Sequence, residues 1–323
     1  MFSIIDISDW TKLTPEQMGT KPKFWCLDSQ GDEYLFKETR SHSGEHWSEK
    51  LAAEIAEALG LPHAKIDLAV YKGKTGTLSW NFLQKQESSS LEHGNQLMFK
   101  HDSRYPKDGP NFGAASHTLD RIFSVLTEQN VRLPTTFVGL PENVRSVSEL
   151  FVGYLLLDAL INNTDRHHEN WAIIVSQTGG QSRLAELAPT FDHASSLGRE
   201  LTDEQRDYRL KAEYMRNDPK KPARRDQTIA GYLSKNDGRS RIYANEQDSK
   251  ALHPMQVFEQ ARTRFPVAGD AWIDRLNRLP TDRFCELLAQ MLPQIMSQSA
   301  RDFSLRLLEL TRVALISRRF QHD

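Results

Sequence analysis

Short apolar runs separated by turn residues dominate the first hundred residues of the chain. Residues 24–27 and 33–37 predict two strands around a polar turn, because each run is short, apolar and bounded by turn-forming residues. Residues 64–71 and 77–83 predict two further strands around a turn that contains two glycines. A strand-rich unit is therefore expected in this part of the sequence.

An amphipathic helix is predicted inside this unit, over residues 46–59. Leu51, Ile55 and Leu59 form its apolar stripe, and the following glycine and proline end it. Because the stripe is narrow, one face of the helix should be buried and the other should meet solvent or a second part of the protein.

The pattern from Thr118 onward is mostly helical. Residues 147–162 are apolar nearly all round, which predicts a helix inside a core. Closing helices are predicted over residues 254–265, 270–279, 282–291 and 299–317. Residues 101–116 indicate a loop or lobe boundary, and the polar stretch 199–241, interrupted by prolines, indicates a surface excursion.

A small strand-rich part followed by a larger helical part is typical of a two-lobed protein kinase. We therefore predict an α+β, bilobal, protein-kinase-like fold, with an N-lobe over residues 1–100 and a helical C-lobe over residues 101–323.

Composition limits the cellular location and the kinds of partner to expect, but it does not indicate a function. The net charge of -2 requires neither nucleic acid nor a membrane as a partner. No apolar run reaches the ~20 residues of a membrane helix, and we see no signal-peptide pattern. Cys26 and Cys285 fit reduced thiols, so a cytoplasmic protein is expected. The basic stretch 209–225 is either a solvated loop, which we favour, or a contact for an acidic substrate, RNA or DNA.

The segment after the apolar helix carries the clearest chemistry. Asp165 and Asn170 stand five residues apart with Arg166 between them. The apolar segment 171–175 predicts a strand, and Asp192 comes after this segment and the turn at residues 178–180. Phosphoryl transfer needs a carboxylate at the attacking hydroxyl and oxygen ligands for Mg²⁺ on the nucleotide phosphates. We predict Asp165 as the catalytic base, Arg166 as its neighbour in the catalytic loop, and Asn170 and Asp192 as metal ligands. An Asx turn competes as an explanation for Asp192.

Lys37 ends an apolar strand, where a lysine is unexpected. A kinase-type site needs such a lysine on the phosphates and a helical glutamate to brace it. Glu49 can supply the brace, with Glu45 and Glu54 as rivals. Gly19 and Thr20 lie in a turn whose N–H groups can contact phosphate oxygens.

Two adjacent histidines in the catalytic segment also suggest a metal site. His167 and His168 precede Glu169, but neighbouring residues rarely point the same way and no Cys or third His lies at ligand spacing. Zinc catalysis is therefore disfavoured, and one of the two rings is expected to hold the loop.

With these residues assembled, the chain resembles the HipA family of serine/threonine kinases, the toxins of bacterial toxin–antitoxin systems. The resemblance covers nearly the whole chain. It rests on the segment 163–167 with Asn170, read as Asn-Thr-Asp-Arg-His and Asn, and on the segment 191–198, read as Phe-Asp-His-Ala-Ser-Ser-Leu-Gly.

The resemblance implies ATP and Mg²⁺ as cofactors and assigns the nucleotide contacts. These are the glycine-turn residues, the phosphate lysine with its glutamate, the hinge and a catalytic-segment histidine: Gly19, Thr20, Lys37, Glu49, Asn81, Phe82, Leu83 and His168.

Two departures from the family pattern bear on regulation. Eighteen residues precede Gly19, so the chain resembles the short HipT-type kinases, in which a separate small HipS-like protein supplies the N-terminal subdomain. The segment 16–18 before the glycine lacks the serine that the family often autophosphorylates; Thr14 and Thr20 are the nearest hydroxyls.

The resulting prediction is a protein serine/threonine kinase and toxin that phosphorylates a translation-related protein, such as an aminoacyl-tRNA synthetase. A helix-turn-helix antitoxin is the expected partner, with DNA reached only through it and no membrane contact. A small-molecule kinase, an adenylyltransferase and a non-catalytic kinase-like subunit of a repressor remain as alternatives.

Overall fold

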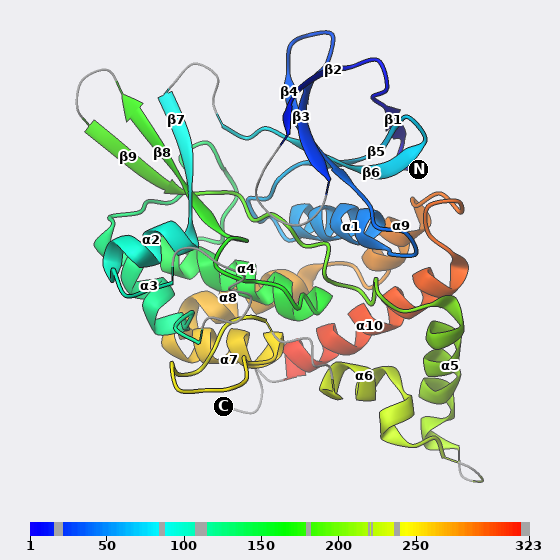
Figure 1. The fold of residues 1–323 in the computed structure, drawn as a ribbon. Coiled ribbons are helices and arrows are strands. Elements are labelled where there is room, and N and C mark those ends of the chain that lie inside the picture. The colour runs from blue at the N-terminus through cyan, green and yellow to red at the C-terminus, as the bar shows by residue number, and fades with distance from the viewer. Residues whose placement is uncertain are drawn as a thin grey trace.

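The fold is α+β, with a β-sheet N-terminal lobe and a helical C-terminal lobe (Figure 1). This confirms the predicted fold class. A computed structural model describes residues 1–15, 22–83, 88–106, 115–178, 182–218, 220, 222–235 and 240–317. The lobe boundary at residue 100 stays a prediction.

The first sheet has six strands in the order β1-β5-β6-β4-β3-β2. Its neighbours are antiparallel except for the parallel pair β1–β5. Its strands are β1 (Ile4–Asp6), β2 (Thr11–Pro15), β3 (Lys23–Leu27), β4 (Glu33–Glu38), β5 (Ile66–Tyr71) and β6 (Lys74–Trp80). The four predicted strands are present, whereas β1 and β2 were not predicted because neither carries a long apolar run.

Helix α1 (Glu45–Ala58) lies between this sheet and the helical lobe (Figure 1). Leu51 and Ile55 are buried, as the apolar stripe predicted. The helix ends where Gly60 takes a positive φ of 64°, a conformation that glycine adopts without steric cost.

A second, three-stranded sheet has the order β7-β8-β9. Its strands are β7 (Ser88–His93), β8 (Ala172–Thr178) and β9 (Ser182–Leu187), all antiparallel. Only β8 had been predicted. Because β7 pairs with β8, the chain segment after β6 belongs with the catalytic segment rather than with the first sheet.

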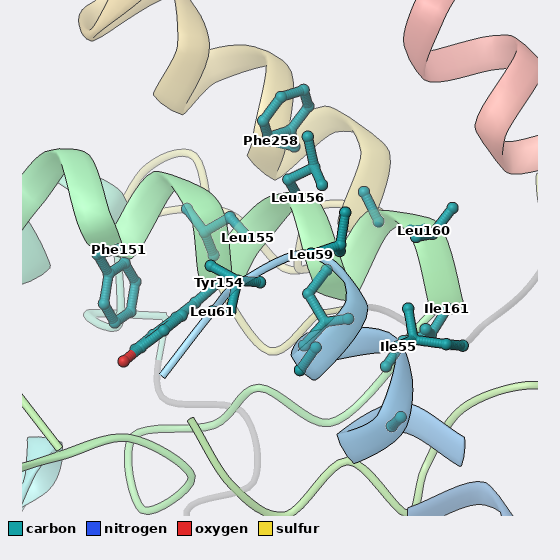
Figure 2. Close-up of a cluster of buried hydrophobic side chains, with 14 of the residues drawn as sticks. Ile55, Leu59, Leu61, Phe151, Tyr154, Leu155, Leu156, Leu160, Ile161 and Phe258 are labelled. Atoms are coloured by element: carbon teal, nitrogen blue, oxygen red, sulfur yellow. The ribbon is translucent and has the colours of Figure 1, made fainter. Parts of the chain in front are cut away.

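Helix α4 (Val147–Ile161) forms the centre of the helical lobe. Ser146 and Glu149 form a capping box at its start, and nearly every residue of the helix is buried. Figure 2 shows Ile55 and Leu59 at the end of α1 close to Ile161 and Leu160 of α4, with Phe258 on the other side of the helix. This core joins the two lobes and fixes the end of α4, where the catalytic segment begins.

The remaining helices make up the rest of the helical lobe. They are α2 (Gly94–His101), α3 (Leu119–Glu128), α5 (Asp203–Tyr214), α6 (Ile229–Lys235), α7 (Pro254–Arg264), α8 (Pro266–Arg278), α9 (Arg283–Ala289) and α10 (Gln298–Ser317), with short 3₁₀ turns at Met215–Asn217 and Arg225–Gln227. Among the described residues, no helix combines the length and the apolar character needed to cross a membrane.

The polar stretch 199–241 is more ordered than predicted. It contains α5 and α6, both of which contact α10, and it buries Leu210 and Ile229. Most of the described residues of this stretch are exposed or half-buried, as expected for a surface segment. Its two helices were not predicted, because the few apolar residues of the stretch lie too far apart to give a clear periodic signal.

Candidate active site

Strand alternation places Lys37 on the inner side of the first sheet. In β3 and β4, Phe24 and Phe36 point into a small buried cluster, so the intervening side chains point to the opposite face. Trp25, Leu35 and Lys37 on that face line a cavity of about 570 Å³ between the lobes. The lysine that looked out of place in an apolar strand therefore lies at the wall of the cleft.

The predicted catalytic loop starts at the end of α4. Asn162 is left-handed with a φ of 53°, which asparagine tolerates better than most residues, and it turns the chain out of the helix. Asn163 then donates its Nδ2–H to Asp158 Oδ1 at 2.8 Å, and the Thr164 backbone N–H donates to Ser195 O at 3.0 Å. The loop is thus tied both to the helix and to the segment after Asp192.

Asp165 and Asn170 lie in the same loop, and both line the cleft. Asn170 donates its Nδ2–H to the Asp165 carbonyl at 2.7 Å. Burial raises the pKa of the Asp165 carboxyl, the Arg241 guanidinium at 3.3 Å opposes this, and the Asp192 carboxylate adds to it.

Arg166 turns away from the cleft into the helical lobe. Its side chain is 1% exposed, and it donates to both carboxylate oxygens of Asp158 at 2.7 and 2.8 Å. It also donates to the carbonyl of Asn170 at 2.5 Å and to Thr190 Oγ1 at 3.1 Å. Arg166 therefore positions the loop rather than touching a substrate.

Asp192 reaches the cleft from the segment after β9. Its backbone is left-handed with a φ of 59°, and its Oδ2 lies 3.4 Å from Lys37 Nζ. The preceding Phe191 lies with its ring centroid 6.2 Å from that of Phe82. The ion pair with Lys37 brings this carboxylate to the predicted phosphate lysine, and the Asx turn stays an alternative explanation for Asp192.

The three glutamates of α1 have different partners. Glu49 is buried, and its Oε1 accepts the backbone N–H of His193 at 3.0 Å, directly after Asp192. Glu54 pairs with Lys50 at 2.6 Å, and Glu45 pairs with Arg199 at 2.8 Å. Glu49 thus supports the segment that carries Asp192, and its bracing of Lys37 stays a prediction.

The predicted hinge residues Asn81, Phe82 and Leu83 all line the cleft. Asn81 Nδ2 donates to Glu33 Oε2 at 2.8 Å, and Asn81 Oδ1 accepts the backbone N–H of Leu83 at 2.9 Å. The hinge position is consistent with adenine contacts, which stay a prediction. Gly19 and Thr20 lie outside the described residues.

The two catalytic-segment histidines point in different directions. His167 lines the cleft, whereas His168 is buried with its Nδ1 2.7 Å from the hydroxyl of Tyr105. The structure thus places His168 behind the cleft and not among the residues that line it, because adjacent side chains diverge. His168 is the ring that holds the loop through Tyr105, whereas His167 is the ring that faces the cleft. Among the described residues, no group of three or more His, Cys, Asp and Glu side chains is arranged to hold a metal ion by itself.

Buried histidines should make the protein sensitive to acid. Burial lowers the pKa of His117 to about 3 and that of His168 to about 4. The unfolded chain protonates these rings near pH 6.5, so the stability that the neutral rings contribute is complete above that pH and is lost as the pH falls toward 4. We expect the free energy of unfolding to fall from pH 6.5 downward, by up to about 1.4 kcal/mol per pH unit for each such ring.

Urea denaturation at pH 7 and pH 5 checks this expectation. Between pH 7 and pH 5, His168→Gln should lose less of its free energy of unfolding than the wild type. His42→Gln, which replaces an exposed ring, is the matched control. Equal losses of the free energy of unfolding in the wild type and in His168→Gln would contradict this expectation.

No role was predicted for the three arginines that line the cleft among the described residues, Arg40, Arg199 and Arg241. Arg199 and Arg241 stand at the ends of the polar stretch 199–241, and both line the cavity. Arg199 also donates to Ser195 Oγ at 3.1 Å. Arg199 closely follows Asp192, which is a weak signal, whereas no motif marks Arg241.

The oxygen-rich donor set fits a magnesium ion. Asp192 and Asn170 face the same cavity as Asp165, and Mg²⁺ binds through one or two carboxylates together with nucleotide phosphates rather than in an all-protein cage. Asn170 uses its amide nitrogen on the Asp165 carbonyl, so its amide oxygen remains the donor for a cation. The residues present therefore suit the metal that the resemblance implies.

Comparisons with known proteins support the fold. No family model and no curated protein matches the sequence. The solved structure of the proinflammatory kinase CtkA of Helicobacter pylori is similar with a TM-score of 0.71 at 16% identity, covering 99% of both chains. A chain of the HipA, HipB and operator DNA complex of the Shewanella oneidensis toxin–antitoxin system is similar with a TM-score of 0.50 at 11% identity; the match covers 95% of this chain and 65% of that one. The chain therefore has a kinase-like fold.

Proposed function

We propose that the chain is an ATP- and Mg²⁺-dependent kinase of HipA type that transfers phosphate to a serine or threonine hydroxyl of a protein. One observation carries this proposal: three segments far apart in the sequence bring Lys37, Asp165 with Asn170, and Asp192 to a single cleft between the lobes. A fold alone permits many functions, but this set of groups matches the needs of phosphoryl transfer.

Each group has a role that its position allows. Asp165 accepts or orients the proton of the acceptor hydroxyl, and Arg166 holds the loop that carries it. Lys37 steadies the α- and β-phosphates, and Glu49 supports the segment of Asp192. Asp192 and Asn170 would hold Mg²⁺, which would supply positive charge at the nucleotide phosphates.

Intact-mass spectrometry with Mg-ATP tests the proposal. The purified chain is incubated with and without a host-cell lysate, beside Asp192→Asn and Lys37→Met. We expect a mass increase of one phosphoryl group on the chain or on a lysate protein. The reaction should be at least about 10²-fold slower in both variants, because Lys37→Met removes the charge at the phosphates and Asp192→Asn removes the charged ligand of Mg²⁺.

Other outcomes of this experiment favour other functions. An increase of one adenylyl group would indicate an adenylyltransferase. ADP release without labelled protein would indicate a small-molecule kinase. Absence of ATP binding in a Mg²⁺ titration would indicate a non-catalytic kinase-like subunit.

The proposed setting is the cytoplasm, with a translation-related protein such as an aminoacyl-tRNA synthetase as the target. The structural likeness to a HipA–HipB–DNA complex motivates a helix-turn-helix antitoxin as partner, with a small HipS-like protein as a second one. Induced expression of the wild type should arrest growth, and Asp192→Asn should not. Normal growth with an active kinase would remove the toxin role and leave the enzyme.

A further inference from the structure

Arg241 lies against the proposed catalytic base although 76 residues separate them in the sequence. Its Nε is 3.3 Å from Asp165 Oδ1, and the two side chains are 40% and 30% exposed. Both line the cleft. None of the kinase roles assigned above includes an arginine at this place.

The backbone around Arg241 is held on both sides. Ser240 donates its backbone N–H to Leu252 O at 2.9 Å, and Leu252 donates its own to Ile242 O at 2.7 Å. Arg241 itself has a φ of 63°, which residues other than glycine rarely adopt. Such a conformation persists only where surrounding contacts impose it, so the segment is fixed rather than loosely draped over the cleft.

His117 anchors Arg241 from behind. Its side chain is buried; Trp171 donates its indole N–H to His117 Nε2 at 3.2 Å, and His117 Nδ1 lies 2.8 Å from the Arg241 carbonyl oxygen. An indole N–H can only donate, so Nε2 is the unprotonated nitrogen and the proton sits on Nδ1. The neutral ring therefore donates to Arg241 in one fixed tautomer. Trp171 directly follows Asn170, so this anchor also connects to the catalytic loop.

We infer that Arg241 is a positioning residue for Asp165 and that His117 in turn positions Arg241; this rests on the proposed kinase function. A guanidinium on one carboxylate oxygen restricts rotation of the carboxylate and leaves the second oxygen to receive the proton of the acceptor. Because a misplacement of about 1 Å can cost on the order of 10²-fold in rate, a fixed partner matters here. The polar stretch 199–241 then contributes to the active site through its last residue.

Arg241→Ala tests the inference at a partly exposed side chain, where the fold is not at risk. ADP release from Mg-ATP is measured with casein as the probe acceptor and with water alone. We expect kcat to fall on the order of 10- to 100-fold while the KM for ATP stays within about twofold, because Lys37 and Asp192 are untouched. Arg241→Lys should recover part of kcat, since it restores the charge.

Matched variants separate positioning from a general loss. Arg183→Ala removes an arginine from another partly exposed ion pair, with side chains 47% and 20% exposed, and should match the wild type. His117→Gln, read beside its melting temperature, should lower kcat in the same direction. A loss in Arg241→Ala that appears in the KM for ATP, or no recovery in Arg241→Lys, overturns the positioning role.

Two further outcomes keep the inference distinct from the proposed function. If the wild type releases ADP and Arg241→Ala releases it equally fast or faster, the inference fails and the kinase stands; a faster rate would indicate that Arg241 blocks Asp165. If the wild type releases no more ADP than Asp165→Asn, the proposed function fails, and with it the need for a positioned base.

Discussion

Asp165→Asn is expected to lower the rate of phosphoryl transfer by about 10²- to 10⁴-fold, the usual contribution of a general base. The amide keeps the size of the carboxylate but does not accept a proton. The backbone contacts that hold the loop, from Asn170 Nδ2 to the Asp165 carbonyl and from Thr164 to Ser195, do not involve the substituted atoms. Fold and ATP binding should therefore persist, and single-turnover kinetics beside calorimetric ATP titration would show the separation.

Asp120→Asn is the matched control for this variant. Asp120 also pairs with an arginine, Arg264, but it lies on α3 with its side chain 83% exposed, outside the residues that line the cleft. It should transfer phosphate at the wild-type rate. An Asp165→Asn chain as fast as this control would falsify the assignment of Asp165 as the base.

The parts of the site that follow from local sequence could be predicted. The all-round apolar helix α4 and the residues directly after it form one local unit, so the catalytic segment could be recognised from its residues alone. Lys37 was visible because a charged residue in an alternating strand stands out, and alternation then determines which face it takes.

The parts of the site that depend on contacts between distant segments could not be predicted from the sequence. Arg241 comes to Asp165 only because the segment 240–243 binds His117 and Leu252, and no local pattern encodes those contacts. Which of His167 and His168 faces the cleft likewise depends on a distant residue, because Tyr105 holds the ring of His168 behind the cleft. Strands β7 and β9 were missed because pairing with β8, rather than their own apolar content, makes them strands.

Asp158→Leu should cost about 3–5 kcal/mol of the free energy of unfolding, the usual penalty for breaking a buried ion pair. The reason is that Arg166 remains charged at any ordinary pH, so its guanidinium would stay buried with its main anionic partner gone. Asn163 would lose an acceptor as well. Against a total stability of roughly 5–15 kcal/mol this is a large fraction, and urea denaturation would measure it.

Two comparison variants show what the buried pair contributes. Arg283→Ala breaks an exposed pair, with side chains 35% and 55% exposed, and should cost about 0–1 kcal/mol. Asp158→Leu combined with Arg166→Met should regain much of the lost stability, because no unpaired charge remains. If Asp158→Leu lowers the free energy of unfolding no more than Arg283→Ala does, the ion pair of Asp158 and Arg166 is not shielded from water as its burial indicates.

The double variant also separates stability from activity. Arg166 donates to the carbonyl of Asn170 and to Thr190, and methionine replaces neither contact. A chain that regains its stability without Arg166 should therefore still transfer phosphate slowly, since the loop between Asp165 and Asn170 has lost the group that spans it. If the double variant recovers both its stability and its rate of phosphoryl transfer, Arg166 is not needed to hold the loop.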